Sequence, residues 1–266
     1  MTRAGRRCIF CGDGGLSREH VWPAWAAKYL PDMAHAVMAG LELTPDSFVS
    51  PRERLRTMQG STKNLTVKAV CRRCNNGWMG RLEEAAKPAV TVLLTRDGSA
   101  ISADQAAPLR RWIFMKSACL DHARFIESVF DPASLVAFRA GGDLPTNFQA
   151  WIYRNDTDAW CAALRMLTFV AVQPGEPVYE ACNARLMLWG LGSSTILVSW
   201  SPIHGGRPVA NVEDGADIVI KLVPGEGELN LPTRGLQEGD HDKLVSGLLG
   251  AIRPRPDVPA PKWKLV

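Results

Sequence analysis

No stretch of this sequence approaches the roughly 18 consecutive apolar residues that a membrane-spanning helix needs, so no membrane contact is expected. The basic residues at its start lead into no apolar segment, which argues against a secretory signal and makes the cytoplasm the expected location. Internal repeats and low-complexity tracts are also lacking. What remains is a globular composition of 266 residues, 46% hydrophobic and 22% charged, which is enough for a sizeable core.

Negative charge is scarce in the first third of the chain. Residues 1–90 hold 14 lysines and arginines against 8 aspartates and glutamates, whereas the remaining residues hold 17 against 19. All of the excess positive charge therefore lies in the first third, which favours a polyanionic partner for that segment. A solvated surface that is uneven by chance would give the same count.

Cysteine is infrequent, but four of the seven cysteines form two CxxC pairs. The paired residues are Cys8, Cys11, Cys71 and Cys74. Four thiolates on two tight turns are the ligand set of a tetrahedral zinc ion, and such an ion can supply on the order of 10 kcal/mol of folding free energy. Because the protein fills all four positions, this zinc is expected to be structural, and other residues must carry any reaction.

Local patterns predict an α+β chain in two parts, with the polar stretch 96–100 as the boundary. The first part, residues 1–95, has a predicted strand at 65–70 and a long irregular loop at 31–62. A predicted helix begins near Gly77, with Asn75 and Asn76 as its cap, and ends at Pro88.

The second part, residues 101–266, is predicted to be a larger α+β domain. An amphipathic helix is expected at 106–125, followed by four strands and a short helix at 242–249. The strands are expected at 148–153, 186–189, 195–200 and 217–223. This part carries no functional signature, and substrate recognition, homodimer formation and signal sensing are all open as its role.

Glu19 and His20 are the candidate reactive residues between the two cysteine pairs. Hydrolysis of a phosphodiester needs a base that deprotonates water and a divalent cation that neutralises charge on the leaving oxygen. An adjacent imidazole and carboxylate can serve both needs if they flank one phosphate. Alone, this dipeptide would be interpreted as an ordinary surface pair.

Together these motifs resemble the HNH endonuclease superfamily. The resemblance covers residues of about 6–87 and is closest to the branch written CxxCG, EHV and CxxCNN. It implies a treble-clef-like ββα-metal module, in which two strands and a helix are joined by zinc. It also implies hydrolysis of DNA with a single Mg²⁺ or Mn²⁺ ion, leaving 5′-phosphate and 3′-hydroxyl ends.

The resemblance also assigns individual roles. His20 matches the general base, and Glu19 matches a ligand of the catalytic divalent ion. Asn75 matches the second protein ligand of that ion, and a plain helix cap is its other interpretation. Asn64 is the candidate for the asparagine that orients the base, with Asn76 as its rival. Two departures are a Glu where Asp is more frequent, and the position of Asn64 seven residues before Cys71, further upstream than in the commoner pattern.

Basic residues between and within the cysteine pairs are the candidate phosphate contacts. They are Arg52, Arg54, Arg56, Lys63, Lys68, Arg72 and Arg73. DNA is the expected partner and RNA stays open, while a solvated charged loop is the other interpretation of residues 52–56. The alternative function is a zinc-finger module of the same fold that binds nucleic acid or protein without cutting.

Overall fold

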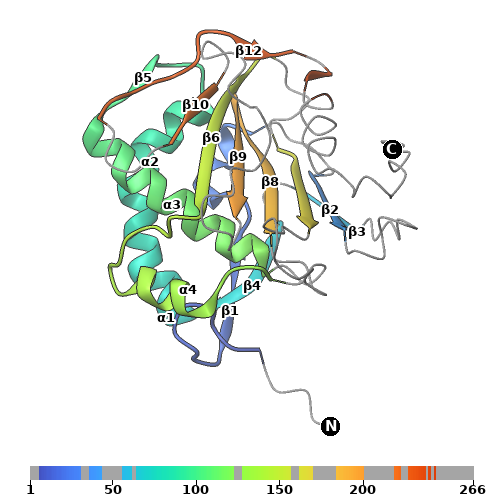
Figure 1. Ribbon diagram of the computed structural model, residues 1–266, viewed down its shortest axis with the longest axis vertical. Helices are drawn as coiled ribbons and strands as arrows, with labels where there is room; N and C mark the ends of the chain where they lie inside the picture. Colours follow the sequence, from blue (N-terminus) through green and yellow to red (C-terminus); the bar gives the residue numbers. More distant parts are fainter. Residues whose placement is uncertain are drawn as a thin grey trace, which may run out of the picture.

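The structure is a computed structural model with one large sheet, helices against one of its faces, and a small hairpin at one end (Figure 1). The residues that it describes are 6–30, 36–43, 56–61, 64–122, 128–156, 162–169, 184–200, 219–222, 227–237, 239, 240 and 243. Within them the chain is a mixed α+β protein, as predicted. None of the described helices is both long and apolar enough to cross a membrane.

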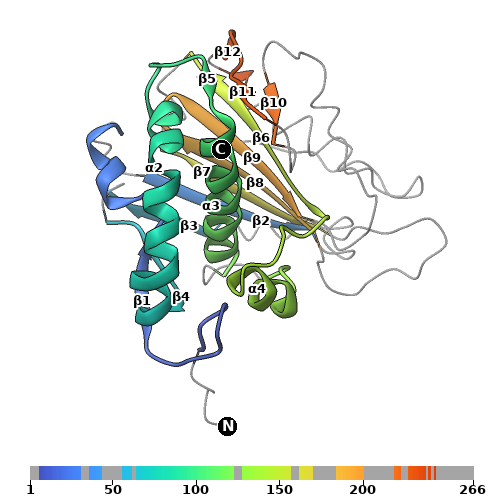
Figure 2. The same ribbon diagram turned by 90° about the vertical axis from the view of Figure 1, so that its left-hand side faces the viewer.

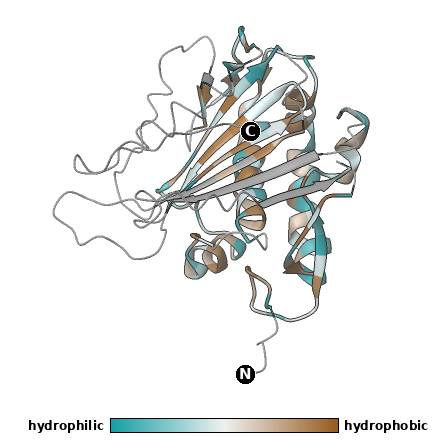
Figure 3. Ribbon diagram, turned by 90° about the vertical axis from the view of Figure 1, so that its right-hand side faces the viewer, coloured by the Kyte–Doolittle hydropathy of each residue, from teal (hydrophilic) through white to brown (hydrophobic). Residues whose placement is uncertain are grey.

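The main sheet has eight strands and is mostly antiparallel. Seven of them follow one another in space as β10 (Val219–Lys221), β6 (Phe148–Asn155), β9 (Ser194–Trp200), β8 (Ala184–Leu191), β7 (Leu164–Phe169), β2 (Ala36–Leu43) and β3 (Arg56–Gly60). The eighth, β12 (Gly235–Leu236), pairs with β6 in parallel. Figure 3 shows hydrophobic stretches along its central strands, where β8 and β9 are buried throughout.

Strands β2 and β3 correct the prediction of an irregular loop at 31–62. They pair with each other antiparallel, and β2 also pairs in parallel with β7, with Met38 opposite Leu164. A strand partner so distant along the chain leaves no local pattern, and both glycines of the segment, Gly40 and Gly60, lie within the strands. The first third of the chain therefore contributes two strands to the main sheet.

Two long helices cover one face of this sheet. Figure 2 shows α2 (Gly80–Leu94) and α3 (Ala103–Asp121) side by side in front of it, with α4 (Pro132–Arg139) near the end of α3. Between α2 and α3, the short strand β5 (Ala100–Ile101) pairs with β11 (Leu229–Asn230). Almost every residue of α3 from Leu109 onward is buried, so this helix is the centre of the hydrophobic core.

Before these helices lies a two-stranded antiparallel sheet, here called the hairpin, whose strands are separated in the chain by β2 and β3. It consists of β1 (Leu16–His20) and β4 (Thr66–Cys71), with the 3₁₀ helix η1 (Ala24–Lys28) after β1. Strand β4 leads directly into α1 (Arg72–Cys74), the π-helical turn η3 (Asn75–Met79) and α2. Before β1, residues 9–11 form a turn.

The helical segment after the second cysteine pair is longer than predicted. A first turn begins at Arg72, where the Cys71 sulfur accepts from the Cys74 N–H, and the main helix follows a kink at Gly77 (φ −95°, ψ −109°), close to the predicted start. It also runs through Pro88 to Leu94, although proline lacks the N–H that would bond Glu84 and costs about 3 kcal/mol inside a helix. Pro88 is exposed, and the buried stripe of the second half, which includes Val90 and Leu93, offsets that cost.

One continuous hydrophobic cluster joins both parts of the chain, from Cys8 to Leu231. Trp22, after β1, is buried and donates its Nε1 hydrogen to the Gly190 oxygen of β8 over 2.8 Å. The turn between β8 and β9 meets the end of α2, because the Ser193 N–H donates to the Leu94 oxygen over 3.2 Å. The predicted boundary at 96–100 lies in the connection after α2, and a separation into two domains there stays a prediction.

Candidate metal centre

The first cysteine pair lies on a tight turn. The Gly12 N–H donates to the Cys8 oxygen over 2.8 Å, and the Cys8 N–H donates to the Asp13 oxygen over 2.8 Å. Gly12 has a φ of 74°, a conformation that side chains other than glycine rarely adopt. The turn is tied to β4 by a bond of 3.0 Å from the Ile9 N–H to the Ala69 oxygen, which brings it to the second pair.

The second pair lies where β4 passes into the helix. Cys71 ends the strand and caps the helix, and Cys74 follows one turn later with 1% of its surface exposed. Both pairs thus sit on hydrogen-bonded turns that orient two side chains to the same side. This local geometry follows from the CxxC spacing.

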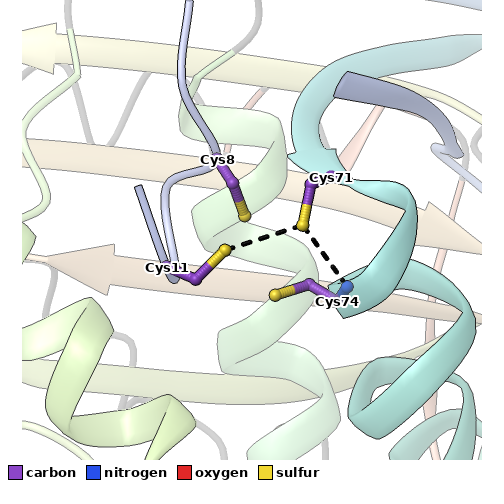
Figure 4. A group of neighbouring side chains, drawn as sticks. All are labelled: Cys8, Cys11, Cys71 and Cys74. Atoms are coloured by element: carbon purple, nitrogen blue, oxygen red, sulfur yellow. Dashed lines mark hydrogen bonds between the residues drawn. The ribbon is translucent and has the colours of Figure 1, made fainter. Parts of the chain in front are cut away.

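The four thiols converge on one point (Figure 4). All four Sγ atoms lie within 4.8 Å of one another, and those of Cys11 and Cys71 are 3.6 Å apart. A zinc–sulfur bond of about 2.3 Å implies an edge of roughly 3.8 Å between sulfurs in a tetrahedral site. The five described cysteines are all free thiols. The cluster can therefore hold a zinc ion, as the sequence predicts.

The thiols differ in their tendency to ionise. Burial opposes ionisation of Cys71, but the Cys74 N–H and neighbouring thiols that donate to its sulfur outweigh burial and lower its pKa. Burial raises the pKa of Cys11 and Cys74. Zinc binds thiolates, so its binding to the cluster would release the protons of the thiols that it binds.

Glu19 and His20 follow each other in β1 but face opposite ways. Glu19 lies opposite Val67 in the register and both are buried, whereas His20 lies opposite Thr66 and both are half-exposed. The alternation of side chains along a strand explains the difference. The structure thus brings the Glu19 carboxylate into the core and leaves the imidazole on the outer side of the hairpin.

Lys116 of α3 meets Glu19 inside the core. Its Nζ forms an ion pair with Oε1 of Glu19, a second pair with Oε2 of Glu83 over 3.2 Å, and a hydrogen bond to the His20 oxygen over 3.0 Å. The side chains of Lys116 and Glu19 are 1% and 8% exposed. Burial lowers the Lys116 pKa, but the charges of Glu19 and Glu83 outweigh burial and raise it, so the ammonium form persists.

Asn75 reaches back to β1. Its Nδ2 donates to the Ser17 hydroxyl over 3.1 Å and to the Arg18 oxygen over 3.2 Å. The Arg18 carbonyl can only accept, which fixes the amide with Nδ2 toward the strand and leaves Oδ1 for another partner. The helix start and the strand that ends in His20 are thereby joined.

The other asparagines are less connected. Asn64 is exposed, its N–H donates to the Ser61 oxygen over 2.9 Å, and it lies two residues before Thr66, the partner of His20. Asn76 is exposed on the helix. Asn64 is therefore nearer than Asn76 to His20 in the strand register, but neither has a described bond to it.

The predicted basic contacts fall in two groups. Lys68, Arg72 and Arg73 are exposed around the hairpin, and Arg73 forms an ion pair of 3.0 Å with Asp13. The side chains of the other four lie outside the described part of the structure; these are Arg52, Arg54, Arg56 and Lys63.

Sequence reasoning missed Lys116 and Glu83. The signal was present, because Lys116 interrupts the apolar run of α3, where a lone charge inside a buried helix requires a partner.

Among the described residues, the four cysteines are the only group of three or more His, Cys, Asp or Glu side chains close enough to hold a metal. Comparison of the chain with protein-family models, curated proteins and solved structures gives no match.

Proposed function

We propose that this chain is an HNH-type endonuclease that hydrolyses phosphodiester bonds in DNA. One observation carries the proposal: the four-cysteine cluster brackets the β1–β4 hairpin, and Asn75, next to the cluster, is bonded to the strand that ends in His20. A structural zinc at the cluster would fix the strand and the helix relative to each other. Asn75, which bonds Ser17 and Arg18 of β1, and His20, at the far end of β1, would then be held on one fixed strand.

His20 is the proposed general base. Its imidazole is half-exposed on the outer side of the hairpin, where it can approach a phosphate from solvent. Histidine accepts a proton from water near neutral pH, and the resulting hydroxide would attack phosphorus and expel the 3′ oxygen. Asn64, close to His20 in the register, is the proposed orienting residue.

Glu19 and Asn75 are the proposed ligands of a catalytic Mg²⁺ or Mn²⁺ ion, which would neutralise charge on the leaving oxygen. Asn75 would contribute Oδ1, because Nδ2 is used by β1. Glu19 would contribute Oε2, because Oε1 is held by Lys116. The exposed cations Lys68 and Arg72 would hold the nucleic-acid backbone beside the hairpin.

The test is cleavage of supercoiled and linear DNA by zinc-loaded protein with Mg²⁺ or Mn²⁺. His20→Ala should lower the cleavage rate by about 10²- to 10⁴-fold and leave zinc content and DNA affinity unchanged. His122→Ala is the matched control, because His122 lies at the end of α3 and bonds the Ala118 oxygen. Wild-type protein that cuts neither DNA nor RNA, or a His20→Ala variant that cuts at the full rate, would exclude this mechanism.

A second candidate function is a zinc module that binds nucleic acid without cutting it. The observation that favours it is the engagement of both proposed metal ligands: Glu19 is paired with Lys116, and Asn75 joins the helix to β1. DNA binding that needs zinc but is accompanied by no cleavage with any divalent ion would support this second function.

A further inference from the structure

The buried ammonium of Lys116 is surrounded by oxygen atoms from two other elements. Glu19 and the His20 carbonyl come from β1, and Glu83 comes from α2. A lysine ammonium has three hydrogens to donate, and here it has three oxygen acceptors. The Trp112 ring, with its centroid 5.9 Å from Nζ, adds a fourth electron-rich neighbour. The ammonium is thus fully coordinated inside the protein.

This set of oxygens is the kind that binds a hard divalent cation. Two carboxylates and a main-chain carbonyl are typical ligands of Mg²⁺, Mn²⁺ and Ca²⁺. In this chain the Lys116 ammonium occupies the place of such a cation. The single Lys116 ammonium faces two carboxylates, so the three side chains together carry a formal charge of −1.

We propose that Lys116 is a built-in cation of the candidate site, which competes with a divalent ion for Glu19 and so limits the affinity of that ion. It also donates to the His20 carbonyl from the core side. Because Glu19 is an ion ligand only in the proposed nuclease, this inference rests on the proposed function. It adds that Lys116, in the second part of the chain, regulates the affinity of the divalent ion.

Electrostatics predicts the sign of the effect. A unit positive charge a few ångströms from a divalent ion repels it appreciably even at an effective dielectric constant of about 20. Removal of that charge should therefore strengthen ion binding. A residue that only oriented Glu19 for the ion would have the opposite effect, because its loss would weaken binding.

The experiment compares Mn²⁺ binding by zinc-loaded wild type and Lys116→Met, using calorimetry and the Mn²⁺ magnetic-resonance signal. Mn²⁺ is suitable because it prefers oxygen and competes least for thiolates. Lys116→Met should bind Mn²⁺ at least about tenfold more tightly than wild type. Arg111→Met is the matched control, because Arg111 is a neighbouring cation of α3 that bonds Gly142 and Phe138 instead. This control should bind Mn²⁺ as wild type does.

A double variant guards against misfolding of Lys116→Met, which leaves two buried carboxylates uncompensated. Lys116→Met with Glu83→Gln keeps the net charge of the wild-type site, so any gain in Mn²⁺ affinity comes from release of Glu19. Affinity equal to or weaker than that of wild type, in whichever of these variants folds, would overturn the proposal. Tighter Mn²⁺ binding without DNA cleavage by any form would instead exclude the nuclease function and leave the role of Lys116 intact.

Discussion

Asn75 donates to the main-chain oxygen of Arg18 over 3.2 Å, and this bond joins the helix after the second cysteine pair to the strand that ends in His20. The residue next to the candidate metal centre is thus in direct contact with the strand that carries the proposed base. A helix cap was the other interpretation of this asparagine, but the described bonds of its side chain go to β1. The side chain therefore connects the helical segment to the strand.

Asn75→Ala should lower both stability and activity. Loss of the two bonds to β1 should reduce the free energy of unfolding by about 1–2 kcal/mol, measured by chemical denaturation. Cleavage should fall and recover partly at higher Mg²⁺, because one proposed ligand is removed. Asn76→Ala is the control, since Asn76 is exposed and adjacent. If Asn76→Ala were the more damaging change, the assignment of Asn75 would be wrong.

The four-cysteine cluster should hold one zinc ion per chain. Elemental analysis of purified protein should find about one equivalent, and Cys74→Ser should remove it and unfold the hairpin, because the zinc–sulfur bonds that join the two turns are lost. Cys119→Ala is the control, since Cys119 is buried outside the cluster and should keep the zinc. Fully folded protein without zinc would contradict this prediction.

Gly192 tests whether the two parts of the chain depend on each other. It has a φ of 59°, and a Cβ there would collide with the Leu94 carbonyl at the end of α2. Gly192→Ala should therefore cost more than about 1 kcal/mol of stability and lower Tm by a few degrees. Gly227→Ala is the control, because a Cβ at Gly227 meets nothing within 4 Å. Equal melting of the two variants would show that this contact is unimportant.

Sequence patterns predicted the features that are local. The cysteine spacing predicted the cluster, and apolar or β-branched runs predicted β4, β6, β8, β9 and α3 within a few residues. In each case the information lies within a few neighbouring residues, as in the CxxC turn around Gly12.

The features that were missed depend on distant partners. Strand β2 exists because β7 pairs with it, and α2 continues past Pro88 because its second half packs against the core. The surroundings of the Glu19 side chain likewise depend on a residue that is distant in the chain. A strand pattern predicts that Glu19 and His20 face opposite sides, but only the position of Lys116 on α3 shows what the carboxylate meets.

Positive charge around the hairpin should provide most of the affinity for nucleic acid. Changing Lys68 and Arg72 to Ala should weaken binding to all sequences alike, because both side chains are exposed near the candidate site and can bind phosphates but not a defined base. The slope of log affinity against log salt should fall by up to about one unit for each phosphate that the protein no longer neutralises. Arg52, Arg54 and Arg56, changed together, test the second basic group in the same way.

Lys243→Ala is the control for this measurement, because Lys243 is an exposed cation of the second part that pairs with Asp240 over 2.8 Å. Its removal should leave the slope unchanged. Binding should be measured at several salt concentrations without a divalent ion, so that cleavage does not consume the DNA. If the slope fell for Lys243→Ala but stayed constant for Lys68→Ala and Arg72→Ala, nucleic acid would bind to the second part of the chain, and the hairpin would not be its contact surface.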